Sequence, residues 1–436
     1  MLKIRTLALT ALASVALMLT LVACSPAAEE PDAGAEPGDA ESETEDPVTG
    51  EEVELTFWMS ANPTLEAAMD DIIQAYMAEN PNVTVVQEAF PFAEYFQKIF
   101  TAFSGGDAPD VFWVDVRTAA FAEQGMLLAL DEYVSEENRT DVIESAWKEA
   151  IWEDTVYSIP LHQLTEALYV NTQMAADAGI EIPTTVEDAW TWEEMVDVTT
   201  ALTVRDGAQT SVWGFGMERH LQDWPLTAII YQGGGQPLSP DLTQADGYIN
   251  SPESAAAISW ITDMVSEHEV MAVEPIPDGF GTEQIAVFHG TSTYRAVLDN
   301  NFPDLDYTVA PLYVGPAGCA VTSGGWNVGI ASTTEHPDVA WDLVDWMTRE
   351  RHLEWVEKSG YLPIRTSVMA DAQFSEYPWT IFLEQLNECS VNRPAIPEYQ
   401  LYNDLMNAAG VDIAIGGNAQ AVLDDVATSL DEELSR

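Results

Sequence analysis

Apolar and polar residues follow two spacings along the chain from residue 53 onward. Segment 53–59 is an apolar run typical of a strand, whereas 65–79 carries its apolar residues at the three- and four-residue spacing of a helix, which Asn80 and Pro81 end. The same patterns predict further strands at 83–86, 110–114 and 326–330, and further helices at 93–103, 192–202, 255–265 and 337–349. Because strands and helices alternate, we expect an α/β fold with parallel or mixed sheets covered by helices on both faces.

The length of 436 residues is enough for two or three folding units of about 100–200 residues each. Hydrophobic residues make up 47% of the chain, and Trp, Tyr and Phe contribute 14 each, which supplies the apolar area for packed cores. The sequence has no repeat of fixed period. Two α/β units therefore fit the pattern better than one.

The first residues have the pattern of an export signal. Lys3 and Arg5 precede an uncharged apolar run at 6–23, which is typical of a secretory signal peptide, although its length approaches that of a membrane-spanning helix. The sequence Leu21-Val22-Ala23-Cys24 resembles the bacterial lipobox. This resemblance implies that residues 1–23 are a lipoprotein signal peptide and that Cys24 becomes the first residue and carries the lipid.

Residues 24–52 are predicted to be a disordered acidic tether. The stretch 25–52 contains eleven acidic residues, much Pro, Ala and Gly, and no Lys or Arg, so it repels itself and has too little apolar area for a core. The folded protein is therefore expected to begin near residue 53.

Acidic residues also dominate the folded part. The chain has 73 Asp and Glu against 15 Lys and Arg; without the two bases of 1–23 and the eleven acids of the tether, 62 acidic and 13 basic residues remain. Such a charge repels phosphate backbones and anionic lipid surfaces, so we expect no nucleic-acid partner. It also keeps the surface hydrated at high salt, which fits a saline habitat or an ordinarily acidic exported protein.

The sequence carries no pattern specific for catalysis or metal binding. With so many carboxylates, a pair at glycosidase separation has almost no diagnostic value. The six His are scattered, no Gly-Lys dipeptide forms a phosphate loop, and no Gly-x-Ser-x-Gly elbow occurs. We therefore predict a protein that is not an enzyme, with no catalytic residue, no metal and no cofactor. Cys319 and Cys389 form either a disulfide or two buried thiols.

Short motifs follow one another in a characteristic order from residue 53 onward. They are Leu55-Thr56-Phe57-Trp58, Gly105-Gly106-Asp107-Ala108-Pro109-Asp110-Val111, Tyr157-Ser158-Ile159-Pro160, Ala167-Leu168-Tyr169-Val170-Asn171, Trp213-Gly214-Phe215-Gly216, Gly324-Gly325-Trp326, Gly360-Tyr361-Leu362-Pro363-Ile364-Arg365 and Asn392-Arg393-Pro394. Each is weak alone, but their order and spacing resemble extracellular solute-binding protein family 1, the maltose-binding-like lipoproteins of ABC sugar importers. The resemblance covers nearly the entire folded chain.

The resemblance implies a two-lobed periplasmic-binding-protein-like fold of type II, with the ligand held in a cleft between α/β lobes. The chain is then expected to cross between lobes near 160–164, near Pro311 and near Gly360. Lobe one would comprise 53–161 and 312–360, and lobe two 162–311 and 361–436.

Aromatic residues near strand ends are the candidates for stacking on a sugar. Sugars present apolar C–H faces to aromatic rings, and open α/β sheets place their ligand crevices at strand ends. Trp58, Trp113 and Trp326 lie at such positions, with core packing as the alternative for each. By resemblance, Trp224 and Tyr294 belong to the second lobe's side of the cleft, although the spacing at Tyr294 departs from the family's and Trp224 also fits a core position.

Polar candidates for sugar hydroxyls are Asn62, Asp115, His162 and Arg393, each at a position that contacts ligand in the family. The alternatives are a helix N-terminus for Asn62, a hinge surface for His162 and a surface ion pair for Arg393. Gly324 and Gly325 would let the backbone approach the ligand, or form a bulge before the strand.

These features together predict a monomeric lipid-anchored receptor on the outer face of the cytoplasmic membrane, which captures a carbohydrate and delivers it to an ABC permease. A neutral sugar is favoured because cations are few, although Arg295, Arg365 and Arg393 would bind an anion if they converged. The alternatives are a secreted carbohydrate-active hydrolase, a receptor for signalling, and a receptor for a polyol or glycerol phosphate.

Overall fold

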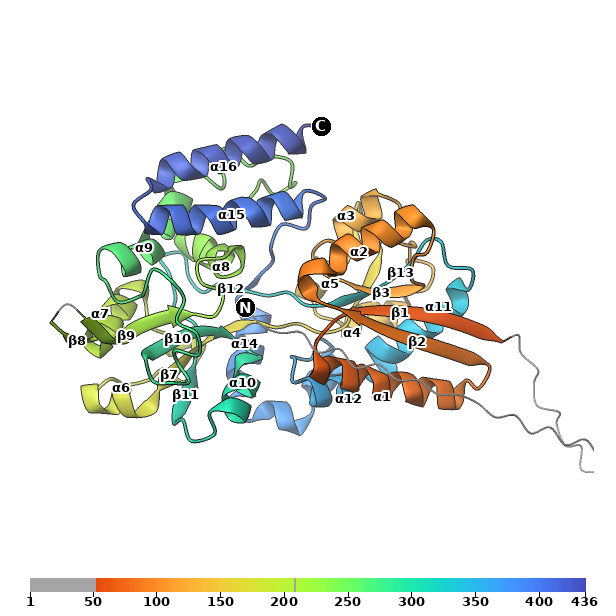
Figure 1. Ribbon diagram of the computed structural model, residues 1–436, viewed down its shortest axis with the longest axis horizontal. Helices are drawn as coiled ribbons and strands as arrows, with labels where there is room; N and C mark the ends of the chain where they lie inside the picture. The colour runs from red at the N-terminus through yellow and green to blue at the C-terminus, as the bar shows by residue number, and fades with distance from the viewer. Residues whose placement is uncertain (1–51, 208) are drawn as a thin grey trace, which may run out of the picture. The chain divides into compact units, whose positions relative to one another are not determined.

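The computed structural model describes residues 52–207 and 209–436 (Figure 1). The predicted signal peptide, the predicted lipid attachment at Cys24 and nearly all of the predicted acidic tether lie outside the described residues. Within the described ranges, no helix is both long and apolar enough to cross a membrane.

The first sheet has the strand order β2-β1-β3-β13-β6. Its strands are β1 (Val53–Ser60), β2 (Val83–Phe90), β3 (Val111–Val114), β6 (Ser158–Pro160) and β13 (Asn327–Ile330). Strands β2 and β3 run parallel to β1, whereas β13 lies antiparallel between β3 and β6. A strand from late in the chain thus completes a sheet begun at residue 53.

Helices cover both faces of this sheet, as predicted. They include α1 (Pro63–Glu79), α2 (Phe92–Gly105), α3 (Thr118–Glu123), α11 (Pro337–Asp345) and α12 (His352–Ser359). Helix α1 begins where the Asn62 side chain accepts hydrogen bonds from two backbone N–H groups, with Pro63 in its first turn, and its buried stripe includes Met69, Ile72 and Tyr76. In Figure 1, α1 lies beside α12, while α2 lies on the other side of β1.

The second sheet has the order β11-β7-β10-β9-β8. Its strands are β7 (Glu166–Asn171), β8 (Val204–Asp206), β9 (Gln209–Met217), β10 (Ile285–Thr291) and β11 (Tyr307–Ala310). Alternate residues of β7 enter different cores, because Leu168 and Val170 pack with one cluster and Ala167 and Tyr169 with another. The cluster of Leu168 and Val170 includes residues of α7 (Trp192–Leu202), α8 (Asp223–Gly233), α9 (Pro252–Ser266), α15 (Tyr399–Ala414) and α16 (Ala419–Leu434). The cluster of Ala167 and Tyr169 includes residues of α10 (Tyr294–Asn301) and α14 (Trp379–Glu388).

Shorter elements connect these layers. They are α4 (Glu136–Asp141), α5 (Glu144–Trp147), β4 (Ile151–Trp152), β5 (Thr155–Val156), α6 (Thr172–Ala178), η1 (Val186–Asp188), β12 (Val321–Thr322), η2 (Trp346–Glu350), α13 (Thr366–Met369), η3 (Ala372–Ser375) and β14 (Ser390–Val391). Strands β12 and β14 pair with each other, and the disulfide Cys319–Cys389 joins the residues beside them. Of the two sequence alternatives for these cysteines, the disulfide is the one formed.

Three segments pass side by side between the two sheets. Backbone hydrogen bonds join Leu164 to Gly324 (N–O 2.9 Å) and Leu362 to Gln163 (N–O 3.0 Å), which ties the segments 161–165, 323–326 and 361–364 together. We call these three the crossing segments.

The resemblance implied a second crossing near Pro311, but the chain does not cross between the lobes there. After β11 the chain stays with the second sheet, because Leu312 and Tyr313 are buried in its core and the Leu312 N–H donates to the Gln385 side chain at 2.7 Å. Val321 also belongs to that core, so the chain leaves the second lobe only at 323–326. The first lobe therefore resumes near residue 325 rather than at 312.

Candidate functional site

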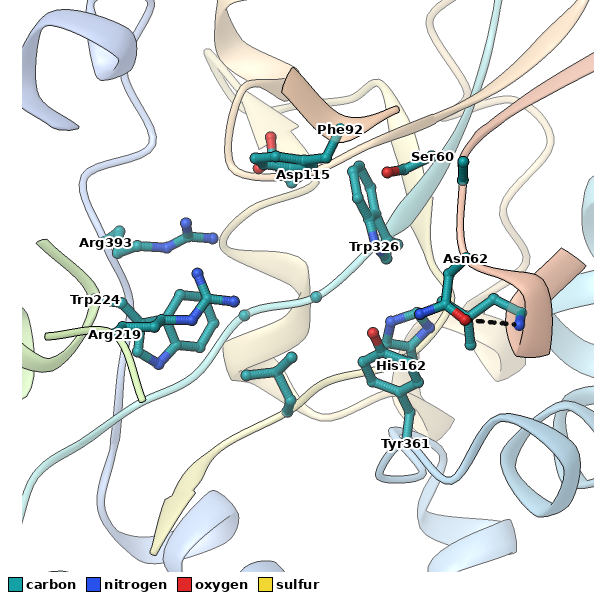
Figure 2. A pocket seen from close by; sticks show the side chains of 15 residues that line it. Ser60, Asn62, Phe92, Asp115, His162, Arg219, Trp224, Trp326, Tyr361 and Arg393 are labelled. Carbon is teal, nitrogen blue, oxygen red and sulfur yellow. Dashed lines mark hydrogen bonds between the residues drawn. The ribbon is translucent and has the colours of Figure 1, made fainter. Parts of the chain in front are cut away.

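A cavity of about 290 Å³ lies against the three crossing segments (Figure 2). The crossing segments contribute His162, Leu164, Gly324, Gly325, Trp326 and Tyr361; the first lobe contributes Ser60, Ala61, Asn62, Leu65, Phe92 and Asp115; the second contributes Arg219, Trp224 and Arg393. Both lobes and the connections between them thus form one site, which is where a two-lobed fold closes on a ligand.

Of the three Trp predicted at strand ends, Trp326 is the one that lines this cavity. Its ring is half-buried and lies on the ring of Trp113, with centroids 5.2 Å apart and planes 30° apart. Phe92, which is 55% exposed, meets Trp326 edge-on at 6.1 Å. A half-buried ring at the cavity wall, next to an exposed phenyl group, is a surface that suits the apolar face of a sugar ring.

Trp113 and Trp58 do not line the cavity, in contrast to the expectation that both are stacking residues. Trp113 has no exposed surface, because β3 is central in its sheet and Trp326 lies over the indole. Trp58 is 8% exposed and packs edge-on against Phe90 at 4.8 Å. Trp113 contributes by supporting Trp326, while Trp58 belongs to the core of the first lobe.

Tyr294 lies apart from this cavity as well. It sits at the start of α10, packs 4.7 Å from Phe288, and lines a separate cavity of about 210 Å³. The local spacing at Tyr294 departs from that of the family, and Tyr294 does not line the cavity at the crossing segments. The aromatic residue that the second lobe contributes to this cavity is Trp224.

Asn62 caps a helix and also lines the cavity. Its Oδ1 accepts hydrogen bonds from the N–H groups of Thr64 (3.1 Å) and Leu65 (3.3 Å), which caps α1. Its amide nitrogen points the other way, toward the cavity (Figure 2). Because the cap consumes the oxygen, Asn62 offers the cavity a hydrogen-bond donor.

Asp115 also lines the cavity, but its carboxylate is already engaged. One oxygen accepts the backbone N–H of Arg117 at 3.0 Å, and the other pairs with the Arg117 guanidinium at 2.5 Å. Arg117 in turn lies 4.3 Å from the ring of Phe96, which fixes the pair at the edge of the first lobe.

His162 is fully buried and presents one unpartnered nitrogen. Its Nδ1 is 3.0 Å from the indole nitrogen of Trp355, and Tyr361 lies against its ring with centroids 3.8 Å apart. Because an indole N–H only donates, Nδ1 is the acceptor and the proton of the neutral ring sits on Nε2. Burial holds the pKa of His162 well below its usual value, so the ring stays neutral. No described residue accepts from Nε2.

Arg393 joins the cavity to a buried network. Its guanidinium lies 3.4 Å from a Glu149 carboxylate oxygen and donates to the Tyr399 hydroxyl at 2.8 Å, and that hydroxyl donates to Asp223 at 2.7 Å. The surface ion pair considered from the sequence is thus a buried one. Burial raises the pKa of Glu149 to about 7, against the pull of Arg393.

The two glycines permit a close approach of backbone segments. A Cβ on Gly325 would stand 1.9 Å from the carbonyl oxygen of His162, and one on Gly324 would stand 2.9 Å from the Glu149 carboxylate. The small residues therefore bring the crossing segments together at the floor of the cavity.

The sequence analysis did not identify several residues that line the cavity. Arg219, which lies 4.9 Å from the ring of Trp224, could have been predicted, because it follows the carboxyl end of strand β9, where open α/β sheets bind ligands. Tyr361 was part of a quoted motif without being assigned a role, and Phe92 follows directly after β2 and Pro91. Arg295 and Arg365 do not converge here: Arg365 pairs with Asp141, and Arg295 lies over Trp379.

Comparison with known proteins places this arrangement in context. The sequence profile described as bacterial extracellular solute-binding protein matches residues 61–352. The maltotriose-binding protein of Pyrococcus abyssi is 23% identical over 345 residues, which cover 74% of this chain and 69% of that protein.

Solved structures share the fold over most of its length. An ABC substrate-binding protein from Listeria monocytogenes in complex with cycloalternan aligns with a TM-score of 0.76 and 20% identity, covering 88% of this chain and all of the other. A Mycobacterium tuberculosis protein in complex with glycerophosphocholine aligns with a TM-score of 0.76 and 21% identity, covering 88% of this chain and 98% of the other.

The fold is therefore that of the two-lobed solute-binding proteins, which bind solutes rather than catalyse reactions. Since the profile matches well over half of the chain, this protein belongs to the bacterial extracellular solute-binding protein family.

Proposed function

We propose that this protein is the extracytoplasmic receptor of an ABC importer and that it captures a carbohydrate in the cavity at the crossing segments. The observation that carries the proposal is the half-buried Trp326 ring, supported by Trp113 and flanked by Phe92, at a cavity formed by both lobes. Closure of the lobes would bury a sugar ring against Trp326 while polar groups opposite take its oxygens.

Relatives and structural neighbours support a sugar as the ligand. One relative is a maltotriose-binding protein, and one structural neighbour was solved with cycloalternan. A receptor with micromolar affinity would gain about 8 kcal/mol on binding.

We also propose that the receptor is a monomer held outside the cell by lipid. Cleavage before Cys24 would leave a lipidated N-terminus on the outer face of the cytoplasmic membrane, and residues 25–52 would let the folded part reach the permease. The lipobox-like sequence at 21–24 supports the anchor. Mass spectrometry of the N-terminal peptide, isolated from membranes, would reveal the lipid or its absence.

A thermal-shift screen with neutral mono- and oligosaccharides and polyols tests the carbohydrate assignment. A sugar at 100 times its dissociation constant stabilises the protein by about 2.7 kcal/mol, which raises Tm visibly. Trp326→Ala should abolish the shift, whereas Trp341→Ala, at a half-buried Trp on α11, should leave it unchanged. A sugar recovered intact after incubation supports a receptor, whereas release of reducing ends would indicate a hydrolase.

A further inference from the structure

Two cations share one aromatic ring at the cavity. The guanidinium carbons of Arg219 and Arg393 lie 4.9 Å and 4.4 Å from the centre of the Trp224 ring, so they are no farther apart than the sum of these distances. Figure 2 shows both groups on the same side of the cavity, pointing toward its centre. Two like charges held so close repel each other unless an anion lies between them.

Only one of these cations has an acidic partner. Arg393 faces Glu149, whereas no hydrogen bond or ion pair in the described part of the chain joins Arg219 to a carboxylate. The folded part of this chain holds 62 acidic residues against 13 basic ones. An arginine that stays unpaired inside a cavity of such a protein has a free charge directed at whatever occupies that cavity.

The opposite side of the cavity also presents donors. His162 lines the site and keeps a buried Nε2–H without a partner among the described residues, because Trp355 occupies its Nδ1. Asn62 offers its amide because the helix cap uses its oxygen. The hydroxyl groups of Ser60 and Tyr361 can donate or accept.

The acidic oxygens at the site, by contrast, are already in use. Both oxygens of Asp115 are bound by Arg117, and those of Glu149 face Arg393 and the Gly325 N–H. A neutral sugar brings one hydroxyl proton for each oxygen and needs acceptors for them. A carboxylate or phosphate accepts without donating and matches the donors that are left over.

We infer that the ligand carries an anionic oxygen group, a carboxylate or a phosphate, on its sugar or polyol, and that this group binds at Arg219 and Arg393 opposite His162 and Asn62. The inference rests on the proposed carbohydrate receptor function and specifies its substrate class. The scarcity of Lys and Arg favours a neutral ligand as long as only the sequence is considered; their placement favours a charged one. The negative surface elsewhere opposes an anion at the site only weakly, because charges farther away than about 8 Å are largely screened at physiological salt.

Matched pairs of probes test the inference on the full chain. Titration calorimetry would compare trigalacturonate with its methyl ester, glucose 6-phosphate with glucose, and glycerol 3-phosphate with glycerol, with maltotriose as a neutral oligosaccharide. At least one acidic probe should bind tenfold or more tightly than its neutral partner. The first pair reports a carboxylate and the other two a phosphate.

Substitutions then locate the anion. Arg219→Gln should weaken binding of the acidic probe about tenfold or more, because a charge-assisted hydrogen bond is lost. Arg219→Lys should recover part of the affinity, and Arg436→Gln, at an exposed residue near the C-terminus, should change nothing. An unchanged Tm of the free Arg219→Gln protein separates this loss from misfolding.

The inference is overturned if no acidic probe binds, if every neutral partner binds as tightly as its acid, or if Arg219→Gln stays within twofold of wild type. Binding of maltotriose or another neutral sugar that Trp326→Ala abolishes would leave the receptor function standing while the anion inference fails. If neither neutral nor acidic sugars bind, the carbohydrate function fails together with the inference.

Discussion

Gly325 shows how a single missing side chain shapes the site. The carbonyl group of His162 occupies the space in which a Cβ on Gly325 would lie, and the carbonyl belongs to the backbone of a neighbouring crossing segment. A rigid backbone atom moves less readily than the end of a flexible side chain. Glycine is therefore required here by close approach rather than by a left-handed conformation.

Gly325→Ala should destabilise the protein by about 2 kcal/mol or more, since overpacking against backbone forces the crossing segments apart. Urea unfolding measures this change. Gly105→Ala is the matched control, because nothing lies within 4 Å of its added Cβ at the exposed end of α2, and it should be nearly neutral. Equal stabilities of the two variants would show that the crossing segments tolerate a side chain.

The buried surroundings of His352 lower its pKa and so make the stability of the protein depend on pH. It is fully buried at the start of α12 and accepts the Ile364 N–H at Nε2. Burial, and next the positive charge of Arg365, lower its pKa to about 3. Its usual value is about 6.5, so between these values the unfolded chain binds a proton that the folded protein does not.

The proton of His352 should therefore lower stability as the pH drops from about 6.5 toward 3, and His352→Gln should change the slope of stability with pH by up to about 1.4 kcal/mol per pH unit, the value for one proton. Glutamine retains an acceptor for the Ile364 N–H. Urea titrations at several pH values measure the slope. The same slope in both proteins at pH 4–6 would refute the assignment of this proton to His352.

At the scale of elements, each segment that spacing predicted as a strand or helix lies on strands or helices of the structure. The strands predicted at 53–59, 83–86 and 110–114 correspond to β1, β2 and β3, and the helix predicted at 65–79 corresponds to α1. The assignment of residues 312–322 to the first lobe was wrong. This segment has few regular elements, and its contacts with the second sheet hold it in the second lobe. The disulfide and the pairing of β12 with β14 hold this region in the second lobe.

Loss of the disulfide should therefore loosen the region beside the second crossing segment. Cys319 and Cys389 are 70 residues apart in sequence, for which loop closure entropy gives about 4 kcal/mol. The double variant Cys319→Ser, Cys389→Ser should be destabilised by roughly that amount in urea unfolding. Wild-type protein in excess reductant should match the variant, and a loss below about 1 kcal/mol would contradict the expectation.

At the scale of the whole molecule, charge is the dominant feature. The 62 acidic residues of the folded part far exceed its 13 basic residues, and carboxylates buried at the site, such as Glu149, are the exception. Repulsion among the exposed acids opposes the compact state, and salt screens it.

Raising NaCl from about 50 mM to 1 M at pH 7 should raise Tm by several degrees, because screening reduces the self-repulsion of the folded state. Differential scanning calorimetry measures the shift. Near pH 4 many carboxylates are neutral, so the same salt increase should act more weakly there. A salt effect of equal size at both pH values would point to a general salting-out effect instead.

The sequence by itself determined the α/β class, the strands and helices with clear spacing, and the resemblance to the family, because these depend on residues close together in the chain. It also selected Trp326, Asn62, Asp115, His162, Trp224, Arg393 and the two glycines for the cavity by their positions in motifs. Only the tertiary structure decided that Trp113 supports Trp326, that Trp58 and Tyr294 lie elsewhere, and that Arg219 and Arg393 both lie at the Trp224 ring. The physical reason is that the exposure of a side chain and the partners of its polar atoms depend on segments far away in sequence, which spacing alone does not record.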